Sequence, residues 1–348
     1  MKNEGYLLAK GCIVSYKPIY EALLFNELNE SCTNIKLLER GRGSAAFTLD
    51  NYNQLLQFQH SRGYIFLQHV HPYQCKIKIS KSRTDLDLFL KELAQILENV
   101  EKNDHLVAQC RIACDEKVDY SNKELTDLFA EKLRLQGFII EPETATVAIS
   151  LTILKDHAFL GVSELKENLS SWTGGVLFFS REDSVICRAE NKLEEAVNYF
   201  EVPLYNKQKV LDLGAAPGGW TNFLSKRGMF VDAVDPAALD SRVLTNKTVT
   251  YYSMTAQEFN RSNLGKEYDL IVNDMKMDTN ESIDILCEMS QWLKKDGAAI
   301  LTLKLPKHEI QKRIQIARNV LGRRFAYIRI HQLYYNRSEV TVFMKQKL

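Results

Sequence analysis

The chain has 348 residues, of which 45% are apolar and 26% charged. This length predicts two or three domains, and the composition is that of a globular protein, which excludes disorder and collagen-like structure for most of the chain. A membrane span of about 20 apolar residues is absent from the sequence, and Lys10 interrupts the first apolar run, so we expect no signal peptide. The seven scattered cysteines predict reduced thiols in the cytoplasm and no disulfide framework or zinc cluster.

Charge is balanced overall, at a net +1, but it is unevenly distributed. Residues 101–200 hold 11 basic and 18 acidic side chains, whereas residues 301–348 hold 11 basic and 2 acidic ones. The basic C-terminal segment favours a polyanionic partner. A solvated basic helix with no partner explains the same count equally well.

The first 167 residues mix short strands with amphipathic helices, which is typical of small α+β domains. Strands are predicted at 11–16, 76–79, 105–114 and 145–153, and helices at 20–27, 84–99 and 125–136. Ser121 and Glu124 fit a capping box before the third helix, and Gly137 fits a C-cap after it. Residues 168–187 are interpreted as a connector.

From residue 188 onward, strands alternate with helices. Strands are predicted at 209–213, 230–234, 268–273, 298–303 and 340–344, and helices at 220–226, 283–293 and 307–321. Such alternation predicts an α/β fold, a parallel sheet with helices on both faces.

The most informative stretch runs from Val210 to Trp220, where an apolar strand enters a turn rich in small residues and then a helix. Glycines let the backbone approach a ligand closely. The spacing is neither a dinucleotide fingerprint nor a P-loop. About 20 residues on, Asp235 follows the next strand, where a carboxylate accepts hydrogen bonds from a ribose diol. The pairing predicts a site for a cofactor that contains adenosine; the alternative is a tight structural loop.

The sequence Asp-Leu-Gly-Ala-Ala-Pro-Gly-Gly-Trp at 212–220 resembles the S-adenosylmethionine-binding motif of FtsJ-like RNA ribose 2′-O-methyltransferases. The resemblance implies a Rossmann-like methyltransferase sheet and S-adenosyl-L-methionine as the cofactor. It departs from the family at Thr255, where many relatives carry an aspartate that contacts the adenine. The implied cofactor-binding residues are Asp212, Gly214, Ala215, Pro217, Gly218, Gly219, Trp220, Asp235, Thr255 and Asp274.

The same family carries a catalytic Lys-Asp-Lys-Glu tetrad, and its sequence contexts recur here around Lys192, Asp274, Lys304 and Glu339. The resemblance implies that Lys304 is the general base and that Lys192 supplies a second cation or steers the substrate. Asp274 and Glu339 would orient the lysine amines and, as anions, would raise their pKa values. Burial and a nearby cation would lower the same pKa values, and the sequence leaves that balance open. The alternative is that Lys304 is a structural cation paired with Asp274. The chemistry needs no metal.

Segments 191–196, 303–306 and 332–342 are each similar to the large-subunit (23S) ribosomal RNA cytidine 2′-O-ribose methyltransferase M family. That resemblance implies a ferredoxin-like α+β region at 1–70, a THUMP-type RNA-binding domain at 71–167, the connector at 168–187 and a Rossmann-like methyltransferase domain at 188–348. The N-terminal similarity is much weaker than the C-terminal one.

Basic and aromatic residues near the C-terminus are candidates for RNA contact, through phosphates or through stacking on a base. They are Lys307, Arg323, Arg324, Tyr335 and Arg337. The expected partner is ribosomal RNA or a pre-ribosomal particle, with no DNA and no membrane. Two alternatives stay open: the same chemistry on transfer RNA or another RNA, and a catalytically silent RNA-binding factor in ribosome assembly.

Overall fold

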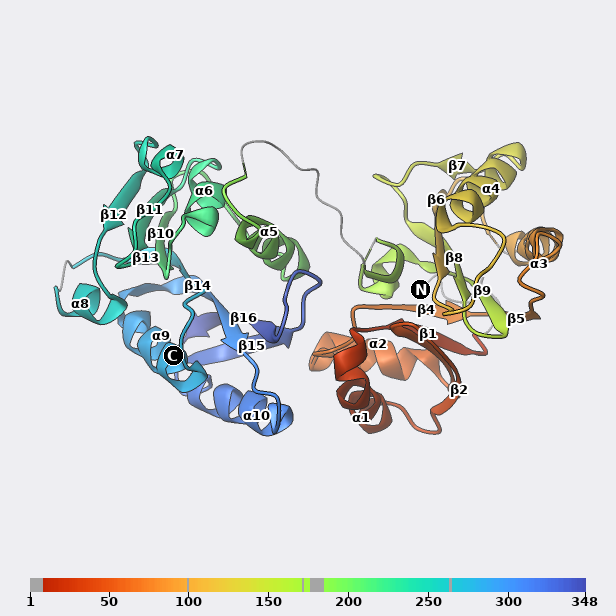
Figure 1. Ribbon diagram of the computed structural model, residues 1–348, viewed down its shortest axis with the longest axis horizontal. Coiled ribbons are helices and arrows are strands. Elements are labelled where there is room, and N and C mark those ends of the chain that lie inside the picture. The colour runs from red at the N-terminus through yellow and green to blue at the C-terminus, as the bar shows by residue number, and fades with distance from the viewer. Residues whose placement is uncertain (1–8, 99, 171, 176–184, 263–264) are drawn as a thin grey trace. The chain divides into compact units, whose positions relative to one another are not determined.

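A computed structural model describes residues 9–98, 100–170, 172–175, 185–262 and 265–348 (Figure 1). The chain divides into two compact units, residues 1–177 and 178–348. Part of the expected connector, residues 171 and 176–184, lies outside the described residues. Within the described ranges, no helix is both long enough and apolar enough to cross a membrane.

The N-terminal unit begins with a four-stranded sheet in the order β2-β3-β1-β4, with every pair antiparallel. Two helices connect its strands in a βαββαβ sequence, which is the ferredoxin-like arrangement. Its elements are β1 (Gly11–Ser15), η1 (Pro18–Tyr20), α1 (Glu21–Ser31), β2 (Lys36–Gly41), β3 (Ser44–Thr48), α2 (Tyr52–Ser61) and β4 (His69–Tyr73). Because β4 pairs with β1 along its whole length, this sheet extends to Tyr73, beyond the boundary expected at residue 70.

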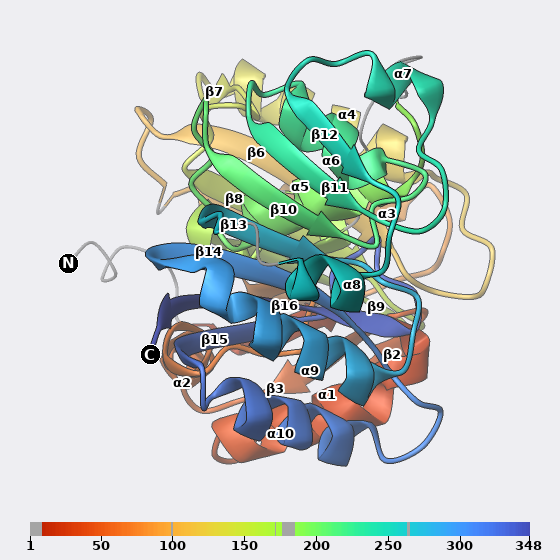
Figure 2. The ribbon, with the colours of Figure 1, turned by 90° about the vertical axis from the view of Figure 1, so that its left-hand side faces the viewer.

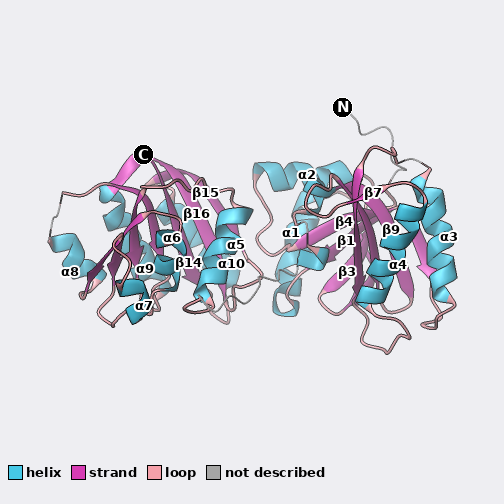
Figure 3. Cartoon of the chain, turned by 90° about the horizontal axis from the view of Figure 1, so that it is seen from above, coloured by secondary structure: helices cyan, strands magenta, loops and turns pink. Residues whose placement is uncertain are grey.

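A second sheet follows in the same unit, in the order β5-β9-β8-β6-β7. Helices α3 and α4 cover one of its faces over a large apolar core, and Figure 3 shows both helices on the same side of the strands. Its elements are β5 (Cys75–Lys78), α3 (Asp85–Leu97), β6 (His105–Ile112), α4 (Asn122–Leu135), β7 (Ile139–Ile140), β8 (Val147–Ile153), β9 (His157–Glu164), η2 (Leu165–Asn168) and η3 (Thr173–Gly175).

The expected helix-end signals appear at α4, with one difference. Ser121 accepts a hydrogen bond from the Glu124 amide at 3.1 Å, as an N-cap should. The Glu124 carboxylate instead pairs with Arg83, 2.5 Å away. Gly137 has φ +83°, the left-handed conformation of a C-cap glycine.

The two sheets of the N-terminal unit pack directly against each other. Tyr73 and Phe159 meet edge to face, with ring centroids 5.0 Å apart, in a small apolar cluster contributed by both sheets. Gly161 allows the closest approach, because an added Cβ would lie 2.1 Å from the Pro72 carbonyl oxygen. Between β4 and β5, the Gln74 side chain donates to the Val162 carbonyl at 3.1 Å and accepts from the Val162 amide at 2.9 Å.

The C-terminal unit is built on a seven-stranded sheet in the order β12-β11-β10-β13-β14-β16-β15, which Figure 2 shows strand by strand. Its elements are α5 (Ala189–Tyr199), β10 (Lys209–Leu213), α6 (Gly219–Ser225), β11 (Phe230–Val234), α7 (Ser241–Leu244), β12 (Val249–Tyr252), α8 (Ala256–Arg261), β13 (Tyr268–Asn273), α9 (Thr279–Met289), η4 (Ser290–Trp292), β14 (Leu293–Lys304), α10 (Ile310–Leu321), β15 (Phe325–His331) and β16 (Glu339–Lys347).

The sheet is mixed, which corrects the expectation of a wholly parallel one. β16 runs antiparallel to both β14 and β15, between which it is inserted. The segment from 332 to 338 is a short return from β15, and a short return produces antiparallel neighbours. The antiparallel direction places the first residue of β16, Glu339, beside the last residue of β14, Lys304.

Helices cover both faces of this sheet, as the α/β pattern predicts. Helices α8, α9 and α10 lie along one face in Figure 2, while α5 and α6 pack together on the other over an apolar core. Helix α10 begins at Ile310 and not at residue 307, because Glu309 at its N-cap has φ +56°. The short edge strand β12 and the edge strand β15 are not among the predicted strands.

Candidate active site

The structure brings together all four members of the Lys-Asp-Lys-Glu set. Lys192 projects from α5, Asp274 follows β13, Lys304 ends β14 and Glu339 begins β16. Strands β13 and β14 are parallel, and β16 runs antiparallel to β14. The ends of β13 and β14 and the start of β16 therefore lie at the same end of the sheet, which brings Asp274, Lys304 and Glu339 together.

The four side chains form a closed ring of alternating charge, here called the charged ring. Lys192 Nζ lies 3.0 Å from Asp274 Oδ2 and 2.7 Å from Glu339 Oε1. Lys304 Nζ lies 3.3 Å from Asp274 Oδ1 and 2.5 Å from Glu339 Oε2. Each carboxylate therefore bridges both lysines, and the two positive and two negative charges cancel.

Exposure differs between the two lysines of the charged ring. The Lys192 side chain is 11% exposed and the Glu339 side chain 9%, whereas the Lys304 side chain is 32% exposed. A buried ion pair loses much of its attraction to desolvation, so its geometry points to positioning more than to stability. Lys304 is the ring amine that a substrate reaches most easily.

The charges of the ring determine the direction in which the pKa values of Lys304 and Glu339 shift. Burial alone would lower the pKa of Lys304, but Asp274 and Glu339 outweigh it and hold that pKa above its ordinary value. Burial alone would raise the pKa of Glu339, and the two lysines reverse this and hold it below its ordinary value. In the unliganded chain, Lys304 is consequently an ammonium and Glu339 a carboxylate.

Glu195 supports the charged ring without belonging to it. It is not among the residues that the sequence singles out for a role. It is buried on α5, three residues after Lys192, and its two carboxylate oxygens accept the Tyr334 amide at 2.6 Å and the Tyr335 amide at 2.9 Å. It thereby fastens the segment that leads into Glu339 to the helix that carries Lys192. The only signal in the sequence is its place in the motif at 191–196.

A cavity of about 440 Å³ opens beside the charged ring, here called the ring pocket. Lys304 and Glu339 face it, and its other lining comes from loops after β13, after β14 and before β16. Its lining residues are Lys276, Met277, Lys304, Leu305, Arg337, Ser338 and Glu339. A substrate group in the ring pocket would contact Lys304 Nζ.

The glycine-rich turn lies where β10 separates its two neighbours, β11 and β13, and ligands of α/β sheets bind at such a switch point. Gly214 has φ +78°, and an added Cβ would lie 2.8 Å from the Met275 Cα, so only glycine fits there. The turn is followed directly by α6.

Asp235 lies at the end of β11, beside this turn. Its Oδ2 accepts the Ala216 amide at 3.1 Å and its Oδ1 accepts the Ala237 amide at 2.7 Å. Each carboxylate oxygen retains a lone pair, so the group is oriented by the backbone and still able to accept from a ribose diol. The donor and acceptor set therefore fits the adenosine part of S-adenosylmethionine.

Three other residues expected at the cofactor use their polar atoms within the protein. Asp212 is buried and accepts the Thr221 hydroxyl at 2.7 Å, and burial raises its pKa to about 7. Trp220 donates to the Ala189 carbonyl at 2.8 Å and holds α6 against α5. The Thr255 hydroxyl closes a capping box with Glu258 at the start of α8.

The expected RNA-binding residues fall into two groups. Arg337 lines the ring pocket, Lys307 is exposed on the loop after β14, and Tyr335 is half-buried beside Tyr334. Arg323 and Arg324 lie just before β15, at the end of the sheet opposite to the charged ring. Arg324 lines a separate cavity of about 440 Å³ there. An RNA contact site beside the charged ring would therefore not include Arg323 and Arg324.

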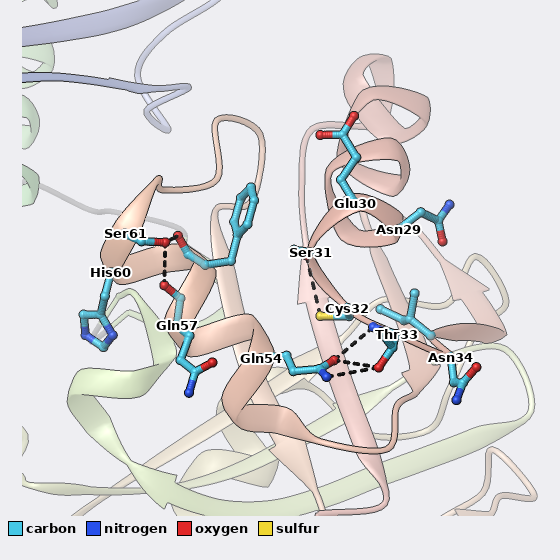
Figure 4. A pocket seen from close by; sticks show the side chains of 12 residues that line it. Asn29, Glu30, Ser31, Cys32, Thr33, Asn34, Gln54, Gln57, His60 and Ser61 are labelled. Atoms are coloured by element: carbon cyan, nitrogen blue, oxygen red, sulfur yellow. Dashed lines mark hydrogen bonds between the residues drawn. The ribbon is translucent and has the colours of Figure 1, made fainter.

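A larger cavity of about 1070 Å³ lies in the N-terminal unit, between the end of α1 and helix α2 (Figure 4). Its walls are mostly amides and hydroxyls; Gln54 accepts the Thr33 amide at 2.9 Å across it, as the dashed lines show. Glu30 and His60 also line it, and it lacks the cluster of basic side chains that phosphate recognition requires.

Residues 185–320, which contain the glycine-rich turn and three members of the charged ring, match the family model described as FtsJ-like methyltransferase. The C-terminal unit contains an FtsJ-like methyltransferase domain. The fourth member, Glu339, lies beyond the matched residues, and the structure places it in the same ring.

Curated relatives match over somewhat more than half of their sequences. The "Ribosomal RNA large subunit methyltransferase M" of Teredinibacter turnerae is 32% identical over 211 residues, which cover 56% of this chain and 58% of the relative. The protein of the same name from Halorhodospira halophila is 31% identical over 196 residues, covering 55% of each chain. The chain thus matches somewhat more than half the length of these relatives. Among solved structures, TrmN from Thermus thermophilus aligns over 97% of this chain and 99% of its own, at 16% identity and a TM-score of 0.39.

Proposed function

We propose that this protein transfers a methyl group from S-adenosyl-L-methionine to a ribose 2′-hydroxyl of RNA, with large-subunit ribosomal RNA as the substrate. The observation that carries the proposal is the charged ring, in which Lys304 faces the ring pocket and is held by Asp274 and Glu339. The FtsJ-like domain match and the names of the curated relatives support the same chemistry.

In this proposal, bound S-adenosylmethionine supplies an electrophilic methyl group on a sulfonium. Asp235, oriented by the Ala216 and Ala237 amides, holds the ribose of the cofactor. The glycine-rich turn brings the backbone close to the cofactor at the switch point of the sheet. Orientation of this kind contributes up to about 7–11 kcal/mol to lowering a barrier.

Lys304 Nζ receives the proton of the attacking 2′-hydroxyl. Because its pKa is held above the ordinary value, the amine first has to lose its own proton, and that step makes the reaction faster at higher pH. Lys192 keeps both carboxylates in place from the buried side, since it bonds to Asp274 and Glu339 at once. Asp274 and Glu339 aim the Lys304 amine at the ring pocket.

The N-terminal unit would bind RNA as a THUMP-type module together with its ferredoxin-like sheet, and the reaction would take place in the cytoplasm. All seven cysteines are unpaired, which suits a reducing compartment. Transfer RNA or another RNA as the substrate, and a silent RNA-binding assembly factor, are the competing possibilities.

The test is transfer of labelled methyl from S-adenosylmethionine to total RNA from cells that lack the gene, followed by digestion to nucleosides. Wild type should yield a labelled 2′-O-methyl nucleoside, Lys304→Ala should yield none, and Lys295→Ala should match wild type. Lys295 is exposed at the opposite end of β14 and is the control. Substrate RNA and ribosomal particles are assayed in parallel. Absence of transfer to all of them, with no cofactor binding, would favour the silent factor.

A further inference from the structure

The walls of the ring pocket are fastened to one another. The Thr279 hydroxyl, at the start of α9, donates to the Lys304 carbonyl at 2.6 Å, which joins the loop after β13 to the end of β14. The Leu305 amide donates to the Ser338 carbonyl at 2.9 Å, which joins the loop after β14 to the segment before β16. The pocket is therefore a preformed site, not a gap between loose loops.

The lining of the ring pocket holds three basic side chains and one acidic one. The ring itself is neutral, but Lys276 and Arg337 add two positive charges to the lining, and its one carboxylate, Glu339, already bonds to both ring lysines. Lys276 is exposed and forms no ion pair or side-chain hydrogen bond with any of the residues that the structure describes. Its ammonium and its three donors are thus available to a ligand.

The two added cations come from elements on either side of the one that carries Lys304. Lys276 belongs to the loop after β13, Arg337 to the segment before β16, and Lys304 lies on the strand end between those elements in the sheet. An anion on each side of a group that contacts Lys304 would match this arrangement. RNA has that form, with a phosphate on both sides of every internal ribose.

We propose that Lys276 and Arg337 bind the two phosphates that flank the target ribose and so place its 2′-hydroxyl at Lys304. This inference rests on the proposed function and adds the substrate contacts of the same site. At about 440 Å³, the ring pocket falls within the range of small-ligand pockets, roughly 300–1,000 Å³, which suits one nucleotide. Arg337 offers a planar fork to a phosphate and Lys276 a point charge.

The test measures RNA binding by the full chain in the presence of S-adenosylhomocysteine, which prevents turnover. The probe is a fluorescein-labelled 12-residue oligocytidylate, and its dissociation constant is measured by anisotropy from 50 to 400 mM KCl. Lys276→Ala should weaken binding several-fold at the lowest salt and make the slope of log K against log salt shallower by about 0.7, the value for one phosphate contact on a single strand. Lys276→Arg should retain most of the slope, and Lys295→Ala all of it.

Two results would overturn the inference: a Lys276→Ala protein with the wild-type slope, or a wild-type protein whose binding of the oligonucleotide does not depend on salt. S-Adenosylhomocysteine affinity is measured for every variant, and Lys276→Ala should leave it unchanged. Failure of the proposed function is visible separately, because it would abolish cofactor affinity or methyl transfer in wild type. A changed slope in Lys276→Ala would then still show a phosphate contact at this pocket.

Discussion

Lys304 and Glu339 are direct partners in the register between β14 and β16, and their side chains meet at 2.5 Å. The contact thus depends on the pairing of two strands in the interior of a sheet and not on loops. Groups held on rigid strands keep a reactive geometry better than groups on loops. The same contact also binds the Lys304 proton more tightly, and the first two predictions follow from that.

The rate of methyl transfer should increase with pH. Lys304 has a pKa above its ordinary value, so only a small fraction of it is neutral near pH 7, and that fraction grows about tenfold per pH unit. We expect kcat/KM to rise steadily from pH 7 to 10 with RNA at low concentration. A rate that is flat across this range while the protein stays folded would remove Lys304 as the base.

Glu339→Gln should move this profile to lower pH. The substitution removes the carboxylate nearest to Lys304 Nζ, and with it much of what keeps that pKa high. We expect a lower maximal rate, because the amine is less well aimed, and half-maximal activity at a lower pH than in wild type. Glu309→Gln, an exposed change on the loop before α10, is the control and should reproduce the wild-type profile.

Glu195→Gln should lower kcat and leave cofactor affinity unchanged. The substitution replaces one carboxylate oxygen with an NH2 group, which cannot accept a hydrogen bond. The side chain can then no longer accept from both the Tyr334 and Tyr335 amides, so the segment leading to Glu339 is held less firmly. We expect a drop in kcat of about tenfold or more, which is the effect of a positioning residue. Glu194→Gln, the neighbouring and partly exposed position that pairs with Arg227, is the control. Equal activity of the two variants would contradict the role.

Asp235→Asn should weaken S-adenosylmethionine binding by at least about tenfold, because a charge-assisted hydrogen bond contributes about 1.5–3 kcal/mol. The amide cannot reproduce the two accepting oxygens that now hold the Ala216 and Ala237 amides. Isothermal titration gives the constant directly. The exposed Asp296, at the far end of β14, supplies the control Asp296→Asn, and an unchanged constant in Asp235→Asn would show that this carboxylate does not hold the ribose.

The N-terminal unit should lose stability as the pH falls from about 6.5 toward 4. Burial lowers the pKa of His71 to about 4, so the unfolded chain takes up its proton first and stability declines across that window. The loss from this group is at most about 3 kcal/mol. Hydrogen exchange of peptides spanning β4 and β8 should show it, and His71→Gln, which retains an amide partner for Thr152, should reduce it. His60→Gln, on the surface of α2, should not.

Local patterns in the sequence predict much of the C-terminal sheet. The strands at 209–213 and 230–234 are found as expected. A short apolar run bounded by turn residues is typical of a buried strand in an α/β fold. The direction of β16 could not be predicted, since strand spacing does not say which neighbour a strand joins. The sequence predicts that Asp274 and Glu339 raise the pKa of Lys304, but whether they outweigh burial depends on that direction and could not be predicted.

The candidate site was predictable where a motif marks it. The contexts of Lys192, Asp274, Lys304 and Glu339 pointed to all four residues that the structure brings together. Glu195 lies in the motif at 191–196 but nothing in it marks that residue for a role, and Lys276 belongs to no motif. The relevance of both comes from backbone amides and loops that meet only in the folded chain. The cofactor contact of Thr255 stays a prediction: the sequence shows this residue as a departure from the family at the adenine position, and in the structure its hydroxyl caps α8.

In the N-terminal unit, the chain passes from β4 to β5 through the single residue Gln74, whose side chain is bonded to β9 of the second sheet. A hinge needs a few residues that can change their backbone angles freely, and this crossing has none. The two sheets therefore move as one rigid body. A ligand that contacts both sheets would meet two surfaces that keep one orientation to each other, and any adjustment of fit would have to come from the ligand.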